Sequence, residues 1–169
     1  LLGRGTGVTM TATGYTVLIG NDAGAAINSA DADGTIAIGY GAGVAITSGQ
    51  KNTILGYRSG ETLTTGDYNV FLGGFAGDES VDGNRNTSVG YAALGADAGD
   101  DNVAMGYWSL LSCTGTNNVA IGSYAGDALT SGAKNTIIGV SADGDGTASG
   151  GNNQIVIGWS AVGHGDNIA

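Results

Sequence analysis

The stretch Gly115-Thr116-Asn117-Asn118-Val119-Ala120-Ile121-Gly122 contains the pattern that recurs along the whole chain. It consists of Gly, two variable residues, Asn, a β-branched residue, a small or apolar residue, a large aliphatic residue and Gly. A period of about 17 residues is shorter than those of the helical repeat families and corresponds to one coil of a β-solenoid. The closing glycines of the repeats lie roughly 16 to 19 residues apart: Gly20, Gly39, Gly56, Gly73, Gly90, Gly106, Gly122, Gly139 and Gly158.

The composition agrees with a folded repeat protein that lacks helices. The 169 residues include 34 Gly and no Pro, and 41% of the residues are hydrophobic. Glycine costs about 1 kcal/mol per helical position relative to Ala, and no window shows an apolar stripe at helical spacing. We therefore predict an all-β fold, a parallel β-solenoid (β-roll) of about nine short coils. With coils about 4.8 Å apart, the rod would be on the order of 40 Å long.

Each repeat is expected to contain a strand just before its closing glycine, with two faces. The residue three before the glycine is always β-branched, and the residue one before it is always a large aliphatic. These two positions share one face of a strand, which we predict to point into the coil. The predicted core ladder comprises Ile19, Ile38, Leu55, Leu72, Val89, Met105, Ile121, Ile138 and Ile157.

The residue between those two positions is predicted to face away from the coil. This middle row carries no charge, and a strand that is apolar on both faces is buried on both. The sequence offers no second layer to cover it, so we predict that the row lines the contact in a side-by-side homotrimer. The predicted subunit contact comprises Leu18, Ala37, Ile54, Phe71, Ala104, Ala120, Ile137 and Val156.

Three further rows complete the predicted coil. Six repeats carry Asn four residues before the closing glycine, as at Asn118, and stacked Asn side chains can hydrogen-bond along a ladder. Three residues after the closing glycine only Ala or Ser occurs, which indicates a tight bend. A second, weaker strand is predicted around Ile27, Ile46, Leu63, Val81, Leu94, Leu110 and Leu129.

Charge and rare residues disfavour several classes of function. The net charge of −10 disfavours nucleic-acid partners and docking on anionic membranes. No apolar run is long enough to insert into a membrane. The single histidine, His164, lies outside the repeats and the single cysteine, Cys113, has apolar neighbours, so neither a hydrolase triad nor a His/Cys metal cluster is predicted. We expect no enzymatic activity.

Acidic turns and aromatic residues are the remaining candidates for binding. The turns Asp97–Asp101, Gly77–Glu79 and Asp143–Asp145 offer oxygens to Ca²⁺ but do not match the nonapeptide Ca²⁺-binding repeat, so we expect no cofactor, with Ca²⁺ as the minor alternative. Aromatic residues cluster just after the closing glycines. Packing between neighbouring coils or between subunits is the favoured interpretation, and a strip that stacks on sugars or grips a receptor is the alternative. The candidate receptor contacts are Tyr57, Tyr91, Tyr107, Trp108 and Trp159.

The predicted organisation has three parts. Residues 1–14 form a lead-in or cap, residues 15–162 form the β-roll repeats, and residues 163–169 form a tail or the start of a stalk. Insertions disturb the period around residues 30–33 and 143–152. The sequence does not begin with Met, so we expect a fragment or a processed chain.

The repeats Asn52–Tyr57, Asn86–Tyr91 and Asn118–Ser123 resemble the head repeats of trimeric autotransporter adhesins. The Thr-Ser-Gly or Thr-Thr-Gly before the Asn is closer to the related repeats of bacteriophage tail fibres, and Leu1–Gly7 resembles a segment common in phage fibre proteins. The resemblance implies left-handed parallel β-rolls, three side by side about a threefold axis. It implies a virion tail fibre that contacts a glycan or protein of the host surface, or alternatively an adhesin head on a bacterial cell surface.

Two other classes remain as remote alternatives. Left-handed β-helix acyltransferases also use aliphatic-Gly repeats, but the hexapeptide period is not kept through the second half of each repeat, and the only histidine lies outside the array. An ice-binding solenoid needs a flat, regular Thr face, and Thr occupies the β-branched position in only three repeats.

Overall fold

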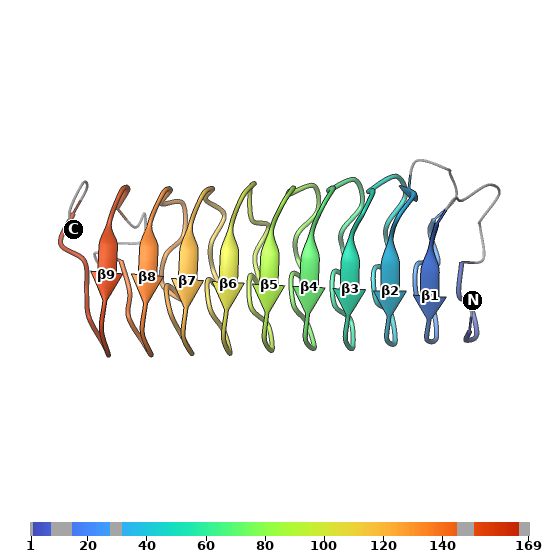
Figure 1. Ribbon diagram of the computed structural model, residues 1–169, viewed down its shortest axis with the longest axis horizontal. Coiled ribbons are helices and arrows are strands. Elements are labelled where there is room, and N and C mark those ends of the chain that lie inside the picture. Colours follow the sequence, from blue (N-terminus) through green and yellow to red (C-terminus); the bar gives the residue numbers. More distant parts are fainter. Residues whose placement is uncertain (1, 8–14, 28–31, 145–150, 166–169) are drawn as a thin grey trace.

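The computed structural model describes residues 2–7, 15–27, 32–144 and 151–165. It confirms the predicted fold class: the chain is an all-β parallel β-solenoid of about eight turns. Each coil contributes one strand to a sheet in which neighbours along the chain are neighbours in space, so the strands form one row in Figure 1. The strands are β1 (Val17–Ile19), β2 (Ile36–Ile38), β3 (Thr53–Leu55), β4 (Val70–Leu72), β5 (Thr87–Val89), β6 (Val103–Met105), β7 (Val119–Ile121), β8 (Thr136–Ile138) and β9 (Ile155–Ile157).

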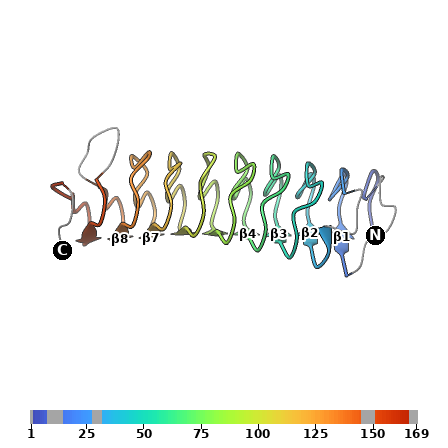
Figure 2. The same cartoon turned by 90° about the horizontal axis from the view of Figure 1, so that it is seen from above.

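The sheet forms one side of the rod, and the rest of each coil returns over its other side (Figure 2). The prediction of a second strand in each coil is wrong for the described residues, because this half consists of consecutive turns. In the coil after β7, Ala125 N–H donates to Gly122 O at 3.2 Å and Leu129 N–H to Gly126 O at 3.1 Å. Tyr124 and Gly126 have φ of 58° and 65°, which is incompatible with an extended chain.

The predicted orientation of the strand faces is inverted. In every strand the middle residue is buried and its two neighbours are more exposed. Ala120 is 0% exposed, whereas Ile121 beside it is 40% exposed. The predicted subunit contact is therefore the core of the coil: Leu18, Ala37, Ile54, Phe71, Ala104, Ala120, Ile137 and Val156. The predicted core ladder lies on the outer face of the sheet: Ile19, Ile38, Leu55, Leu72, Val89, Met105, Ile121, Ile138 and Ile157.

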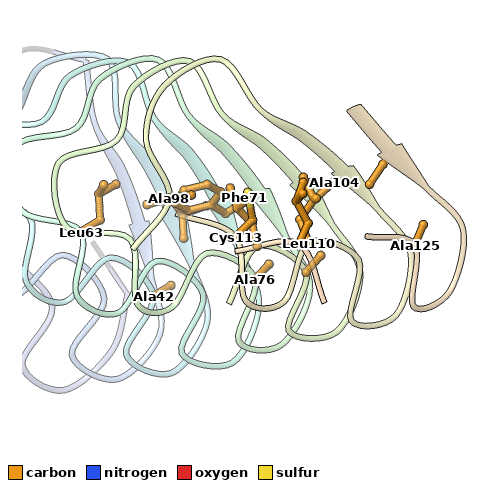
Figure 3. Packing of buried hydrophobic residues seen from close by; sticks show 14 of the residues in the cluster. Ala42, Leu63, Phe71, Ala76, Ala98, Ala104, Leu110, Cys113 and Ala125 are labelled. Atoms are coloured by element: carbon orange, nitrogen blue, oxygen red, sulfur yellow. The ribbon is translucent and has the colours of Figure 1, made fainter. Parts of the chain in front are cut away.

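The narrow interior of the coil explains why the middle row mixes small and large residues. The ring of Phe71 fills the space beside Gly77, where an added Cβ would lie 2.7 Å from the ring. Two coils that carry the small residues Ser88 and Ala104 in the middle row place Leu94 and Leu110 at the position that Gly77 occupies in its own coil. Figure 3 shows the side chains of Phe71, Ala104 and Leu110 inside the coil. In these coils a large side chain in the middle row is thus matched by a small residue four positions after the closing glycine, and the reverse, so the interior stays closely packed.

The Ala/Ser row and the Asn row have the roles that the sequence predicts. The described Ala and Ser residues three after a closing glycine are buried, except for the half-buried Ala161. In the Asn ladder, Asn118 N–H donates to Asn102 Oδ1 at 2.9 Å, and Asn118 Nδ2 donates to Gly132 O at 2.9 Å. The oxygen and the amide nitrogen of each side chain thus link successive coils. The ladder runs through Asn52, Asn69, Asn86, Asn102, Asn118 and Asn135 to the backbone of Gln154.

Residues 2–7 form part of one more coil, within the segment expected to be a lead-in. Leu2 makes a parallel bridge to Ile19, and Leu2 N–H donates to Leu18 O at 3.1 Å. Gly3 has φ of 141°, the conformation of the closing glycines, and it precedes Gly20 by one repeat period. At the other end, Val162 makes a parallel bridge to Asp143. The centres of both predicted insertions and the end of the tail lie outside the described residues.

Candidate binding surface

A continuous row of aromatic rings follows the coils along one edge of the sheet. Tyr91 and Tyr107 stack with centroids 5.6 Å apart, and Phe75 meets Tyr91 edge-on at 5.6 Å. This aromatic row comprises Tyr40, Tyr57, Phe75, Tyr91, Tyr107 and Tyr124, with Trp108 stacked on Tyr107. Packing between neighbouring coils, the favoured interpretation, is therefore correct for these rings.

The structure brings together four of the five predicted receptor contacts. Tyr57, Tyr91, Tyr107 and Trp108 belong to the aromatic row or stack on it, and the three tyrosines are 42–52% exposed. Trp159 is 81% exposed in the last coil, and no ring contact is found for it among the described residues.

Phe75 is not among the contacts predicted from the sequence, although its ring continues the aromatic row in the one coil that carries Gly74 between Tyr57 and Tyr91. Gly74 follows its closing glycine directly, at the position where Tyr57 and Tyr91 stand in the neighbouring coils, and Phe75 comes one residue later. The adjacent pair Gly74-Phe75 was the signal that could have shown it.

A pocket of about 270 Å³ opens where one coil has small side chains at two turn positions. Equivalent residues of successive coils form two rows there. The +2 row, two residues after the closing glycine, contains Arg58, Phe75, Ala92, Trp108 and Tyr124; the +5 row contains Glu61, Asp78, Gly95 and Leu111. Ala92 and Gly95 leave a gap between the larger residues of the coils on either side. The pocket is lined by Phe75, Asp78, Glu79, Tyr91, Ala92, Gly95, Trp108 and Leu111.

Trp108 is the best supported side chain of this pocket. Its ring stacks on Tyr107 with centroids 5.2 Å apart and meets Tyr124 edge-on at 5.7 Å. Its backbone N–H donates to Tyr91 O at 3.1 Å. The indole is therefore held by two neighbouring rings, which reduces the ordering that contact with a ligand would cost.

Two carboxylates, those of Asp78 and Glu79, give the pocket its charge. The pKa of Asp78 is raised to about 6, mainly by burial and also by repulsion from Glu79 and Glu61, against a lowering by a backbone hydrogen bond and by Arg58. Shifted pKa values cluster at functional sites, which makes Asp78 a candidate binding residue.

Replacing Asp78 with Asn is expected to stabilise the fold at pH 7.5 but not at pH 3.5. Because the folded pKa is raised, the stability linked to this group is complete below the unfolded pKa of about 3.8 and is lost as pH rises through about 6. After allowance for solvent screening, we expect a gain of about 1 kcal/mol, or roughly 2–4 °C in Tm. Thermal melts at the two pH values measure it, with Asp127→Asn in another coil as control. An equal shift at both pH values would contradict the prediction.

One of the acidic turns considered for Ca²⁺, Asp97–Asp101, makes bonds between coils, and Asp145 of another lies outside the described residues. Arg85 pairs with Asp100 at 2.8 Å and with Asp101 at 2.7 Å, and Asp97 Oδ1 accepts from Val81 N–H at 2.9 Å. Within the described ranges, no group of three His, Cys, Asp or Glu side chains is arranged to hold a metal ion.

The remaining candidates have simple surroundings. Cys113 is buried, and burial raises the pKa of its thiol to about 11. His164 is exposed near the end of the described chain. A search of the described residues finds no helix that is long and apolar enough to cross a bilayer.

Comparison of the chain with models of protein families, with curated proteins and with solved structures finds no match in any of the three.

Proposed function

We propose that this chain is a structural and adhesive segment of a trimeric bacteriophage tail fibre, in which three copies lie side by side and exposed side chains contact the host surface. The resemblance of the repeats to those of phage fibres supplies this biological setting. The observation that carries the assembly is the apolar outer face of the nine-stranded sheet, which none of the described residues covers.

This outer face is formed by the residues on either side of the buried middle row. No charged residue stands in either of its two rows. Val17, Leu55 and Ile157 are 44%, 47% and 66% exposed. With strands about 4.8 Å apart, the face extends over roughly 40 Å. Soluble monomers rarely expose a contiguous apolar patch larger than a few hundred Å², so a face of this length favours association.

The borders of the face also favour an interface. On one side lies the row that precedes the Asn ladder, which includes the exposed residues Lys51, Arg85 and Lys134. On the other side lies the aromatic row. An apolar centre with a polar rim and aromatic residues is typical of protein interfaces. A second copy parallel to the first and at the same height would meet equivalent residues coil by coil, which suits rotational symmetry.

The fold also favours a role as a stiff rod that transmits force along its axis. Backbone hydrogen bonds join each strand to the next, and the Asn ladder adds buried side-chain bonds across the same steps. Hydrogen bonds that repeat at every coil resist bending, as a fibre segment requires.

The assembly is tested by sedimentation and by one charge on the outer face. The unmodified protein is expected to sediment at three times its chain mass of 16.5 kDa. Ile121→Glu should leave the coil folded, since this side chain points outward, but should shift the protein to monomer, because a carboxylate would be buried unpaired in the contact. Circular dichroism checks that the fold is retained.

A matched control uses the same coil. Asn117→Glu adds the same charge to an exposed residue of the polar rim, and the trimer should persist. A folded monomer for the unmodified protein at tens of micromolar, or an unchanged trimer for Ile121→Glu, would refute the assignment of this face.

A further inference from the structure

Arg58 shows how this scaffold holds a cation between two coils. Its guanidinium carbon lies 5.6 Å from the centre of the Phe75 ring, one coil further along the +2 row. Its Nη2 donates to Glu61, in the +5 row of its own coil, at 2.6 Å. An aromatic face and a carboxylate three residues along the chain therefore hold a planar organic cation together.

The pocket offers the same kinds of group without a cation of its own. Phe75 and Trp108 stand in the +2 row on either side of Ala92. The +5 residue of the Ala92 coil is Gly95, so the carboxylate of the +5 row is that of Asp78 in the preceding coil. Glu79 adds a second carboxylate to the lining. The basic residue that the arrangement would accommodate is absent, because position 92 is Ala where position 58 is Arg.

We propose that this pocket binds an organic cation of the guanidinium or alkylammonium class, with Phe75 and Trp108 contacting the cation and Asp78 and Glu79 balancing its charge. Arginine or lysine side chains and free amines share this chemistry. This proposal specifies the chemistry of the host contact proposed above and rests on that contact. Binding of a cation to a single chain does not require the trimer.

Size and charge support this occupant. Two coil steps of about 4.8 Å separate the backbones that carry Phe75 and Trp108, which leaves room for one flat or compact cationic group between the side chains. A volume of about 270 Å³ suits a small head group with a short alkyl stem rather than a large ligand. The raised pKa of Asp78 reflects burial and neighbouring negative charge, and a bound cation would relieve this repulsion.

The test measures binding of butylguanidinium and choline by ligand-observed NMR at pH 7.5. Butylurea, which has nearly the same shape as butylguanidinium but no charge, and methyl glucoside, the sugar alternative, serve as comparison ligands. We expect millimolar or tighter binding of the cations, at least about tenfold tighter than butylurea, and weaker binding at high salt. Sedimentation of each sample shows separately whether the trimer is present.

The most specific variant is Ala92→Arg, which supplies the cation from the chain itself. Position 92 has φ of 48° and position 58 has φ of 52°, so the backbone already suits Arg. This variant should fold normally and lose cation binding, whereas Ala92→Ser should retain it, because Ser141 and Ser160 occupy the same row in other coils. Trp108→Ala should weaken binding about tenfold, and Trp159→Phe, outside the pocket, should not.

Three results would overturn the proposal. They are equal binding of butylurea and butylguanidinium, preferential binding of methyl glucoside, or cation binding that persists in Ala92→Arg. To separate the sources of the cation, a short Arg-containing peptide is compared with the same peptide carrying citrulline. Peptide binding no tighter than that of butylguanidinium would assign the site to small amines.

Discussion

Replacement of Gly122 with alanine is expected to destabilise the protein by about 4 kcal/mol or more, one of the largest effects of any conservative substitution in the chain. Two independent causes add here. Gly122 has φ of 134°, a conformation that essentially only glycine adopts. In addition, a Cβ at this position would lie 2.5 Å from the carbonyl oxygen of Gly139 in the next coil. That oxygen belongs to the backbone, so it can move only if the two coils separate.

Two matched substitutions separate these causes. Gly158 has φ of 140°, but the nearest atom to its added Cβ is Ala161 Cβ at 3.6 Å, so Gly158→Ala should cost only the conformational strain of about 1–3 kcal/mol. Gly74 has no positive φ, and its added Cβ would make only ordinary contacts, with Tyr91 Cδ2 at 3.5 Å and Tyr57 O at 3.8 Å, so Gly74→Ala should change stability by less than about 0.5 kcal/mol. Urea unfolding of the three variants measures the series. Equal losses for Gly122→Ala and Gly158→Ala would show that the close approach between coils contributes nothing.

The same geometry explains why the fold could be predicted from the sequence. The close approach between one closing glycine and the next requires glycine at one position of each coil that another coil follows, and this requirement makes the period visible. The Asn ladder needs a side chain that both accepts and donates across one coil step: Asn102 Oδ1 accepts from Asn118 N–H, and Asn102 Nδ2 donates to Gly115 O. Rules of this kind depend on one position at a time, so each of them leaves a uniform row in the sequence.

The orientation of the strand faces could not be predicted in this way. In a three-residue strand such as Val119–Ile121, alternation shows that the middle residue opposes its neighbours but not which side is inside. The uniform flanking rows suggested a core, and the variable middle row suggested a surface. The variable middle row instead forms the interior. A residue as large as Phe71 fits there because Gly77 has no side chain and leaves room for the ring. Compensation of this kind involves pairs of positions, and a row-by-row comparison does not reveal it.

The candidate site was predictable only in part for a similar reason. The tyrosines that follow the closing glycines were visible as a row, but the pocket depends on what neighbouring coils lack. Ala92 is unremarkable in the sequence, and it defines a site only once Phe75 and Trp108 are known to flank it. The relation of Arg58 to the Phe75 ring likewise crosses from one coil to the next.

Replacement of Ala120 with glutamate should prevent stable folding of the coils around β7. Ala120 is 0% exposed inside the coil, and an added Cβ on Gly126 would lie 3.7 Å from its own Cβ, so the space on that side is limited. A glutamate there would be both too large and charged in an apolar interior, and each effect alone costs several kcal/mol. We expect loss of the cooperative thermal transition by circular dichroism, whereas Ile121→Glu one residue later should retain it.

Ala120→Ser adds a polar group without a charge and with little extra volume, so it separates the effect of polarity from those of charge and size. Ser88 occupies the equivalent position in β5 and donates from Oγ to Ala93 O at 2.7 Å. The corresponding acceptor for Ala120→Ser is Ala125 O, so this variant should fold with a loss of about 1 kcal/mol or less. Ala120→Glu that folds normally while Ile121→Glu unfolds would reverse the assignment of inside and outside. Because every coil uses the same alternation, one reversal at β7 would apply to the outer face of the whole sheet, and the basis for its role in assembly would be lost with it.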